Sequence, residues 1–213
     1  MRRAERLTAV YDRLFNAFGT QHWWPGETPF EVMAGAILTQ STNWKNVEKA
    51  ILNLKGAGVF DPDTMLAVPS ARLALLIKSS GYFNQKTKKL KNYLEFFKDK
   101  YNASVQKMKM EATATLREQL LGVKGIGKET ADSILLYALE KPVFVVDAYT
   151  SRVLSRHNII SEDATYDELQ ELFMDNLPHD VKLFNEFHAL FVKVGKGFCK
   201  KNPECDRCPL KGI

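Results

Sequence analysis

The chain has 213 residues, a formal net charge of +5 and ordinary apolar content, so it is long enough for one compact unit or two small lobes with a real core. No stretch approaches the roughly eighteen apolar residues that a membrane-spanning helix needs, and the charged first residues lack the apolar core of a signal peptide. The positive net charge favours a polyanionic partner but does not identify it.

Apolar residues recur at helical spacing along almost the whole chain, beginning with Leu7, Val10, Tyr11, Leu14 and Phe15. Thr28, Pro29 and Glu31 have the residue types of an N-cap, a first helical position and a capping box, and they open an apolar helix that runs to Leu38. Further helices are predicted at about 43–54, 63–68, 70–79, 84–99, 112–120, 128–139, 149–157, 165–176 and 180–196.

Strand signals are nearly absent. Only Val143 to Val146 is strand-like, and four apolar residues before an aspartate also suit a buried connection. The predicted fold class is therefore all-α, with about ten helices and short loops. No linker is visible, so we expect any two lobes to pack tightly with a cleft between them.

The segment from Leu120 to Ala131 places three glycines between two helices. Glycine supplies the positive φ of a tight turn and lets the backbone approach a ligand, and the next helix begins with free N–H groups that suit a phosphate. Lys124 and Lys128 add positive charge. The segment predicts either a phosphate clamp or a plain corner between two helices.

Asp147 leaves an apolar run and opens a helix. One interpretation is an ordinary N-cap, which aspartate fills well. The other is a catalytic carboxylate, because cleavage of a glycosidic bond develops positive charge on the sugar that a fixed anion stabilises.

A resemblance to a known family favours the catalytic interpretation. The pattern L-x-G-V-x-G-I-G-K-x-T-A closely resembles the helix-hairpin-helix of endonuclease III-like DNA glycosylases, which are base-excision repair enzymes. Members also carry V-D-x-x-x-x-R-V downstream, matched here by Asp147, Arg152 and Val153, whereas Tyr149 stands where many relatives have histidine. The resemblance implies that Asp147 is catalytic and that the partner is double-stranded DNA with a damaged base. Because the sequence lacks a signal peptide and its cysteines suit a reducing compartment, we expect a cytoplasmic, DNA-associated protein, and we expect it to be a monomer.

The resemblance also implies an architecture and a set of DNA contacts. Residues 20–133 would form a helical barrel lobe with the hairpin, and residues 1–19 plus 134–213 a second lobe that ends in a cysteine loop. In the family a glutamine of the L-x-x-Q-x-T segment fills or lines the gap left by the flipped base, and a loop residue of the G-x-x-N-x-K-A segment enters the duplex. The expected DNA-binding residues are Gln40, Tyr82, Gly122, Lys124, Gly125, Gly127, Lys128 and Thr130.

Two further features of the hairpin follow from the same resemblance. The backbone carbonyls of Leu121, Val123 and Ile126 occupy the positions that hold a monovalent cation, Na⁺ or K⁺, in the family. Bifunctional members carry a lysine nucleophile where this chain has Glu129. A carboxylate cannot form a Schiff base with the sugar, so we expect hydrolysis by an activated water and no strand cleavage.

Residues 22–26 form the rare run His-Trp-Trp-Pro-Gly, which suits either core packing or a stacking wall for a flipped-out base. A cationic alkylated purine stacks especially well on indole. Together with Gln40 and the missing lysine, this run resembles the endonuclease III-like 3-methyladenine DNA glycosylases. The expected base pocket contains Trp23, Trp24, Pro25, Trp44 and Glu129.

All three cysteines lie near the end of the sequence, as Cys199, Cys205 and Cys208. An odd, clustered set suits metal ligation in a reducing compartment better than disulfides. Endonuclease III relatives usually hold a [4Fe–4S] cluster on four cysteines, with spacings of about six, two and five residues. Here the first gap is one residue shorter and the fourth ligand would fall just past Ile213, so the resemblance implies a cluster-type loop with one ligand missing; zinc would also lack one.

Three functions compete at this point. The first is a monofunctional glycosylase for alkylated purines, and the second a related glycosylase for oxidised pyrimidines or mismatched bases. The third is a non-catalytic helix-hairpin-helix DNA-binding module. Asp147 argues against the third, and Glu129 argues against lyase activity in the second.

Overall fold

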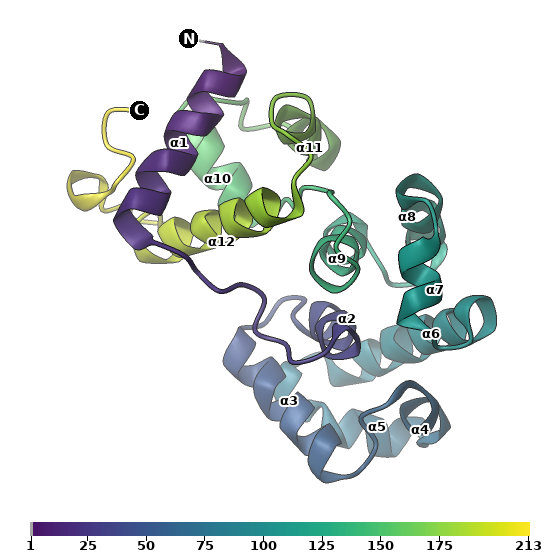
Figure 1. Ribbon diagram of the computed structural model, residues 1–213. Helices are drawn as coiled ribbons and strands as arrows, with labels where there is room; N and C mark the ends of the chain where they lie inside the picture. Colours follow the sequence, from purple (N-terminus) through teal and green to yellow (C-terminus); the bar gives the residue numbers. More distant parts are fainter. Residues whose placement is uncertain (1) are drawn as a thin grey trace. The chain divides into compact units, whose positions relative to one another are not determined.

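The structure is a computed structural model that describes residues 2–213, and this part of the chain is helical without a β-strand. The all-α class predicted from the sequence is confirmed. No helix in the described residues is both long and apolar enough to cross a membrane. In chain order (Figure 1) the elements are α1 (Arg3–Phe18), α2 (Pro29–Leu38), α3 (Trp44–Gly56), α4 (Pro62–Ala67), α5 (Ser70–Leu76), η1 (Lys78–Ser80), α6 (Phe83–Tyr101), α7 (Val105–Met110), α8 (Thr113–Gly122), α9 (Lys128–Ser133), η2 (Ile134–Ala138), α10 (Ala148–Arg156), α11 (Tyr166–Met174), α12 (Val181–Gly197) and η3 (Cys205–Arg207).

The chain forms two compact units. The first unit consists of Met1–Trp24 and Pro142–Ile213, and the second unit consists of Pro25–Lys141. The second unit is thus inserted into the first along the sequence. The first unit contains α1, α10, α11 and α12, and the second contains α2 to α9 with η2.

A cluster of phenylalanine rings forms the core of the first unit. Phe144 stacks on Phe173 with ring centroids 3.6 Å apart, and Phe187 stacks on Phe191 at 4.8 Å. α12 supplies several of these rings because its apolar residues repeat at helical spacing, and it packs against α1 and α10 (Figure 1). The buried face of α12 therefore packs against α10, the helix that begins after Asp147.

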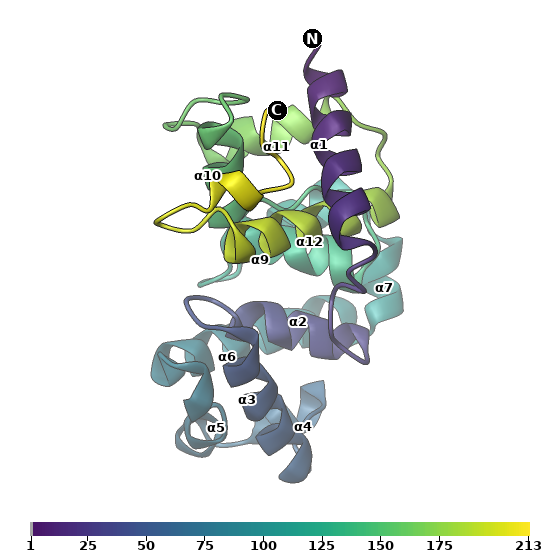
Figure 2. The same ribbon diagram turned by 90° about the vertical axis from the view of Figure 1, so that its left-hand side faces the viewer.

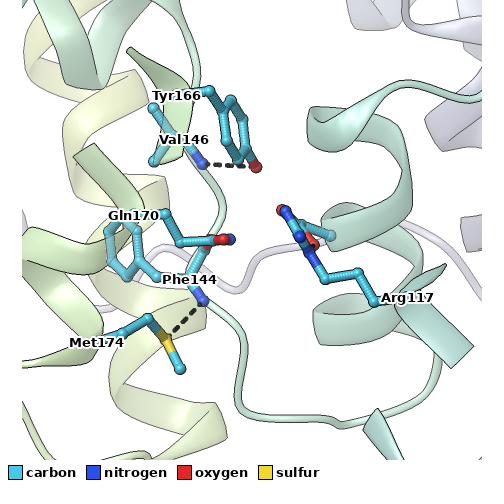
Figure 3. A network of polar contacts seen from close by, with 7 residues as sticks. Arg117, Phe144, Val146, Tyr166, Gln170 and Met174 are labelled. Carbon is cyan, nitrogen blue, oxygen red and sulfur yellow. Dashed lines mark hydrogen bonds and ion pairs between the residues drawn. The ribbon is translucent and has the colours of Figure 1, made fainter. Parts of the chain in front are cut away.

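Residues 143–146 form a buried connection, so the second of the two interpretations of this apolar run is the correct one. No strand lies beside this connection among the described residues, and several of its backbone polar groups bond to side chains of α11 instead. Gln170 Nε2 donates to the Phe144 carbonyl at 2.7 Å, and the Val146 N–H donates to the Tyr166 hydroxyl at 3.4 Å (Figure 3). α11 therefore holds the segment that leads into Asp147.

α2 lies at the centre of the second unit. Its residues from Glu31 to Leu38 are all buried, and α3, α6, α9 and η2 pack around it; Figure 2 shows it beside α3 and α6. Thr28 Oγ1 accepts the Glu31 N–H at 3.1 Å, so the predicted N-cap is confirmed. The predicted capping box is wrong, because the Glu31 carboxylate turns to Lys55 of α3 at 2.8 Å, where its burial requires a counter-charge.

The helix predicted over 128–139 is divided into α9 and a five-residue π-helix, η2. The run Ile134–Ala138 is almost entirely buried, and apolar periodicity does not distinguish a π-turn from an α-turn there. Before it, Asp132 is fully buried and forms a two-point ion pair with Arg117 of α8, with N–O distances of 2.6 and 3.0 Å. This pair fixes the two helices of the hairpin to each other.

Candidate active site

Asp147 is both the N-cap of α10 and a carboxylate with one oxygen left for chemistry. Its Oδ1 accepts the Thr150 N–H at 2.8 Å and the Thr150 hydroxyl at 2.9 Å. The side chain is 12% exposed. These two hydrogen bonds fix the rotation of the carboxylate, so the two interpretations made from the sequence are compatible.

The other oxygen of Asp147 faces a histidine that sequence analysis missed. His188 of α12 is buried, and its Nε2 lies 3.8 Å from Asp147 Oδ2. On its other side the ring bonds through Nδ1 to the Val145 carbonyl at 2.9 Å. A sequence signal existed, since this histidine lies one turn after Phe184 on the apolar face of α12, a position that ordinarily takes an aliphatic or aromatic side chain.

Trp23 and Trp24 belong to the same unit as Asp147 and His188. Their rings meet edge to face with centroids 5.4 Å apart, and the Trp23 ring lies 6.3 Å from the His188 ring. Both tryptophans are half-buried. Trp23 Nε1 is buried without a hydrogen-bond acceptor in residues 2–213. An indole N–H that is buried and lacks an acceptor marks this place as suited to a polar, flat ligand.

In the second unit, Gln40 follows α2 with its side-chain amide held at both ends. Its Nε2 donates to Thr130 Oγ1 at 2.8 Å, and its Oε1 accepts a hydrogen bond from Lys89 Nζ of α6. Because a lysine ammonium can only donate, the amide oxygen must face Lys89 and the amide nitrogen must face Thr130. The structure thus brings together Gln40 and Thr130, two of the residues predicted to bind DNA.

The hairpin between α8 and α9 requires glycine at position 125. Gly125 has φ +99°, and a Cβ there would lie 2.5 Å from Lys89 Cγ. Asn92 of α6 donates to the Lys124 carbonyl at 2.8 Å, which fixes the turn from the same side. Lys124 and Lys128 are exposed. The hairpin thus presents backbone and positive charge outward, as a phosphate clamp requires.

Tyr82 lies at the start of α6 in the left-handed region, with φ 44°, and is 66% exposed. The loop behind it is held by Lys86, whose buried Nζ donates to the Leu38 carbonyl at 2.8 Å and the Ser80 carbonyl at 2.5 Å. Burial, with a smaller effect of Lys89, lowers the pKa of Lys86 to about 8. One buried ammonium therefore links the loop of Gln40 to the loop of Tyr82.

Three predicted pocket residues lie in the second unit, whereas Trp23 and Trp24 lie in the first. Pro25 is exposed at the beginning of the second unit. Trp44 is half-buried at the first position of α3, after the N-cap Asn43. Glu129 is exposed in the first turn of α9, on the hairpin itself.

The predicted cation ligands lie on the same hairpin. The Val123 carbonyl accepts the Ile126 N–H at 3.0 Å, which leaves it one lone pair for an ion. Val123 and Ile126 are buried, so their side chains anchor the turn in the unit. Their carbonyls are part of the backbone of this turn. The monovalent cation at Leu121, Val123 and Ile126 stays a prediction.

The three cysteines line one small cavity of about 80 Å³ in the first unit, together with His157 and Arg156. Cys199 is buried and Cys205 is exposed. Burial raises the pKa of the Cys208 thiol. Arg156 lies 3.4 Å from Cys199 Sγ and 2.6 Å from the Lys200 carbonyl.

A [4Fe–4S] cluster of the endonuclease III type takes four cysteines, and residues 2–213 supply three of them at this loop. Within residues 2–213, no three His, Cys, Asp or Glu side chains are grouped so as to hold a metal ion. Protein hydrogen bonds hold the loop instead. Arg152, the arginine of the V-D-x-x-x-x-R-V motif, donates to the Cys199 carbonyl at 2.7 Å and the Gly195 carbonyl at 3.1 Å.

Comparison with known proteins agrees with this arrangement. The HhH-GPD superfamily of base excision DNA repair proteins matches residues 34–179. A putative DNA repair glycosylase of Methanocaldococcus jannaschii is 48% identical over 208 residues, which cover 97% of this chain and 94% of that protein. Endonuclease III of Thermotoga maritima is 29% identical over 184 residues, covering 86% of this chain and 81% of its own.

Solved structures give the same result. The Helicobacter pylori 3-methyladenine DNA glycosylase bound to 1,N6-ethenoadenine superposes with a TM-score of 0.78 at 32% identity, covering 92% of this chain and 98% of that one. An endonuclease III trapped as a covalent intermediate with DNA shares the fold, with a TM-score of 0.83 at 23% identity over 99% and 94% of the two chains. The chain is a DNA glycosylase and belongs to the HhH-GPD superfamily of base excision DNA repair proteins.

Proposed function

We propose that this glycosylase hydrolyses the N-glycosidic bond of alkylated purines such as 3-methyladenine and does not cleave the DNA strand. The observation that carries the proposal is the oriented carboxylate of Asp147, and the sequence adds Glu129 at the position where bifunctional relatives have lysine. Asp147 can stabilise a cationic sugar, whereas Glu129 cannot attack it as an amine would. The 32% identity to a 3-methyladenine glycosylase supports the same substrate class.

The leaving group explains why so little acid–base machinery is needed. A purine alkylated at N3 is already a cation, so it departs as a neutral base without being protonated. The developing positive charge then moves to the sugar, where a fixed carboxylate is most effective. Asp147 is suited to this task because Thr150 prevents its carboxylate from turning away.

In this proposal, Trp23 and Trp24 select the base by stacking. Trp23 and Trp24 meet edge to face, so one of them can present a face to a flat ligand while the other supports it. A cation on a desolvated indole gains on the order of 2 kcal/mol, or about thirtyfold in discrimination against a neutral purine. In the same proposal, the negative charge of Glu129 favours a cationic base over a neutral one. Trp44 supplies a further aromatic face.

DNA binding is assigned to the second unit. The hairpin with Lys124 and Lys128 would hold phosphates, Gln40 would occupy the gap left by the flipped base, and Tyr82 would enter the duplex. The exposure of Tyr82 supports its role, because a large aromatic side chain in a left-handed turn gains nothing from packing there.

The [4Fe–4S] cluster of the resemblance has no place in this reaction. Residues 2–213 supply three thiolates at this loop, and Arg152 and Arg156 hold the loop through backbone carbonyls. If a cluster were bound, it would lie at Cys199, Cys205 and Cys208 and would stabilise this loop. No step of the proposed hydrolysis depends on it.

A base-release assay over a panel of duplexes tests the proposal. We expect release of 3-methyladenine without strand cleavage, and no release of thymine glycol or of thymine opposite guanine. Trp23→Ala should lower the release of 3-methyladenine by about thirtyfold while binding to undamaged DNA stays within twofold. Release of an oxidised pyrimidine in preference to 3-methyladenine would refute the substrate class and leave the glycosylase assignment intact.

A further inference from the structure

We infer that His188 is a second catalytic residue, which holds the attacking water together with Asp147 and takes a proton from it. This deepens the proposed hydrolysis and rests on it. The observation is the juxtaposition of His188 Nε2 and Asp147 Oδ2, 3.8 Å apart, in a buried part of the first unit.

The hydrogen bonds of His188 determine which nitrogen is basic. Its Nδ1 lies 2.9 Å from the Val145 carbonyl, and a carbonyl oxygen only accepts. Nδ1 therefore carries the hydrogen in the neutral ring, and Nε2 presents a lone pair toward Asp147. The distance of 3.8 Å is too long for a direct hydrogen bond and short enough for one water to contact both atoms.

The carboxylate is prepared for the same water. Thr150 donates its N–H and its hydroxyl to Oδ1, so Asp147 presents Oδ2 to His188 in a fixed orientation. A water between Oδ2 and Nε2 directs both hydrogens at the protein and keeps its lone pairs for the sugar carbon. Such an oriented nucleophile avoids the entropy cost of capture from bulk solvent.

The reaction balances without a further reagent. The water oxygen forms a bond to C1′ of the deoxyribose while the C1′–N bond breaks, and the bonding electron pair leaves with the base. A proton of the water passes to His188 Nε2, and the resulting imidazolium lies beside the Asp147 carboxylate. A cationic alkylated purine thereby departs as a neutral base, and the proton returns to solvent when the products leave.

The position of His188 agrees with a role in base release. Its ring lies 6.3 Å from the ring of Trp23, whose buried Nε1 has no acceptor in the described residues. The competing explanation is a histidine that only holds the Val145 carbonyl in the core. That explanation does not involve the Asp147 carboxylate, which lies 3.8 Å from Nε2.

Two substitutions separate these explanations because they preserve opposite ends of the ring. His188→Asn keeps a donor for the Val145 carbonyl and removes the group that faces Asp147. His188→Gln keeps a polar group near Asp147, one that can hold water without taking its proton, and removes the donor to Val145. A purely structural histidine predicts nearly wild-type release by His188→Asn and poorer release by His188→Gln.

Our inference predicts the reverse order. In single-turnover release of 3-methyladenine, His188→Asn should be about 100-fold slower than wild type, and His188→Gln about tenfold slower. The Kd for DNA should stay within twofold for both. His179→Gln is the matched control, since this exposed histidine bonds the Met174 carbonyl through Nε2 at 2.8 Å and glutamine keeps a donor at that end of the ring; its base release should be unchanged. A fully active His188→Asn would overturn the inference and leave the proposed function standing.

A measurement without substrate tests the geometry independently. Two-bond ¹H–¹⁵N spectra of the labelled full chain report the tautomer of each neutral histidine, and the signal lost in His188→Asn identifies His188. We expect the Nδ1–H form. An Nε2–H form overturns the inference whatever the enzyme releases, whereas a wild-type protein that releases no damaged base refutes the proposed function and not the tautomer.

Discussion

The two compact units hold their functional side chains by different means. In the first unit, whose core contains stacked phenylalanine rings, Thr150 fixes Asp147 from the same helix and the Val145 carbonyl fixes His188. In the second unit, three loops that lie far apart in sequence are tied to one helix, α6, through Lys86, Lys89 and Asn92. The proposed chemistry therefore depends on two largely buried side chains of the first unit, and the proposed DNA contacts depend on loops that long polar side chains hold together.

Substitutions in the two units should therefore separate catalysis from DNA binding. A change at Asp147 removes charge without loosening the unit around it. A change on α6 or in the hairpin alters several loops together, because each lysine bonds to a loop other than its own.

Asp147→Asn should lower base release by about 1,000-fold or more, because the variant loses the charge that stabilises the sugar cation. Asparagine is as good an N-cap as aspartate, so α10 should form and the melting temperature should stay close to that of wild type. Single-turnover base release and the Kd for duplex DNA, measured together, check this. A large loss of DNA affinity would show that the units do not divide their tasks.

Gly125→Ala should weaken DNA binding by about tenfold, whereas Gly56→Ala at the end of α3 should leave it unchanged. A Cβ on Gly125 would collide with Lys89 and strain a residue at φ +99°, while nothing lies within 4 Å of a Cβ on Gly56. The strain should also cost about 1 to 2 kcal/mol of unfolding free energy. Equal effects of the two substitutions on the Kd would contradict the proposed role of the Lys89 contact.

Lys86 should make the stability of the protein depend on alkaline pH. Its pKa is lowered from 10.5 to about 8 by burial, so between these values the unfolded chain binds more protons than the folded one. The free energy of unfolding of wild type should therefore rise, relative to Lys86→Met, as the pH increases from about 8 to 10.5, by at least about 1 kcal/mol. Denaturant titrations of both proteins at pH 7, 8.5 and 10 measure this difference, and a constant difference would show that Lys86 is not desolvated.

Removal of metal should have the smallest effect. Because Arg152 and Arg156 hold the cysteine loop through backbone carbonyls, we expect a strong chelator to shift Tm by less than about 1 °C. Arg152→Lys is the comparison, since it cannot keep both of its carbonyl contacts and should cost about 1 to 2 kcal/mol. A drop in Tm of many degrees on chelation, with iron or zinc in the filtrate, would mean that the loop depends on a bound metal.

Local sequence patterns predicted much of the fold. The helical spacing of apolar residues located α2, α6 and α12, and Thr28 identified one N-cap through its chemistry. α7 was missed, because six residues with three polar side chains show too little periodicity, although Ser104 caps it. The Glu31–Lys55 pair was missed for a different reason, since it joins two helices and no local pattern specifies such a partner.

The residues of the candidate site also fall into two groups, those in local sequence motifs and those whose partners are distant in sequence. Asp147 and the hairpin glycines stand in recognisable motifs, so the sequence indicated them directly. His188 and Lys89 act through residues more than forty positions away, at Asp147, Val145 and Gln40. Such partners depend on how the helices pack, which one sequence without a structure does not determine.

Borohydride trapping during turnover tests the central claim, hydrolysis without a covalent intermediate, most directly. Wild type incubated with a 3-methyladenine duplex and borohydride should release the base and form no covalent protein–DNA adduct, because Glu129 offers no amine. Glu129→Lys, run in parallel, restores an amine at this position and serves as the positive comparison for trapping. An efficient adduct from wild type would contradict the account, and its loss in Lys128→Gln would identify the neighbouring lysine as the nucleophile.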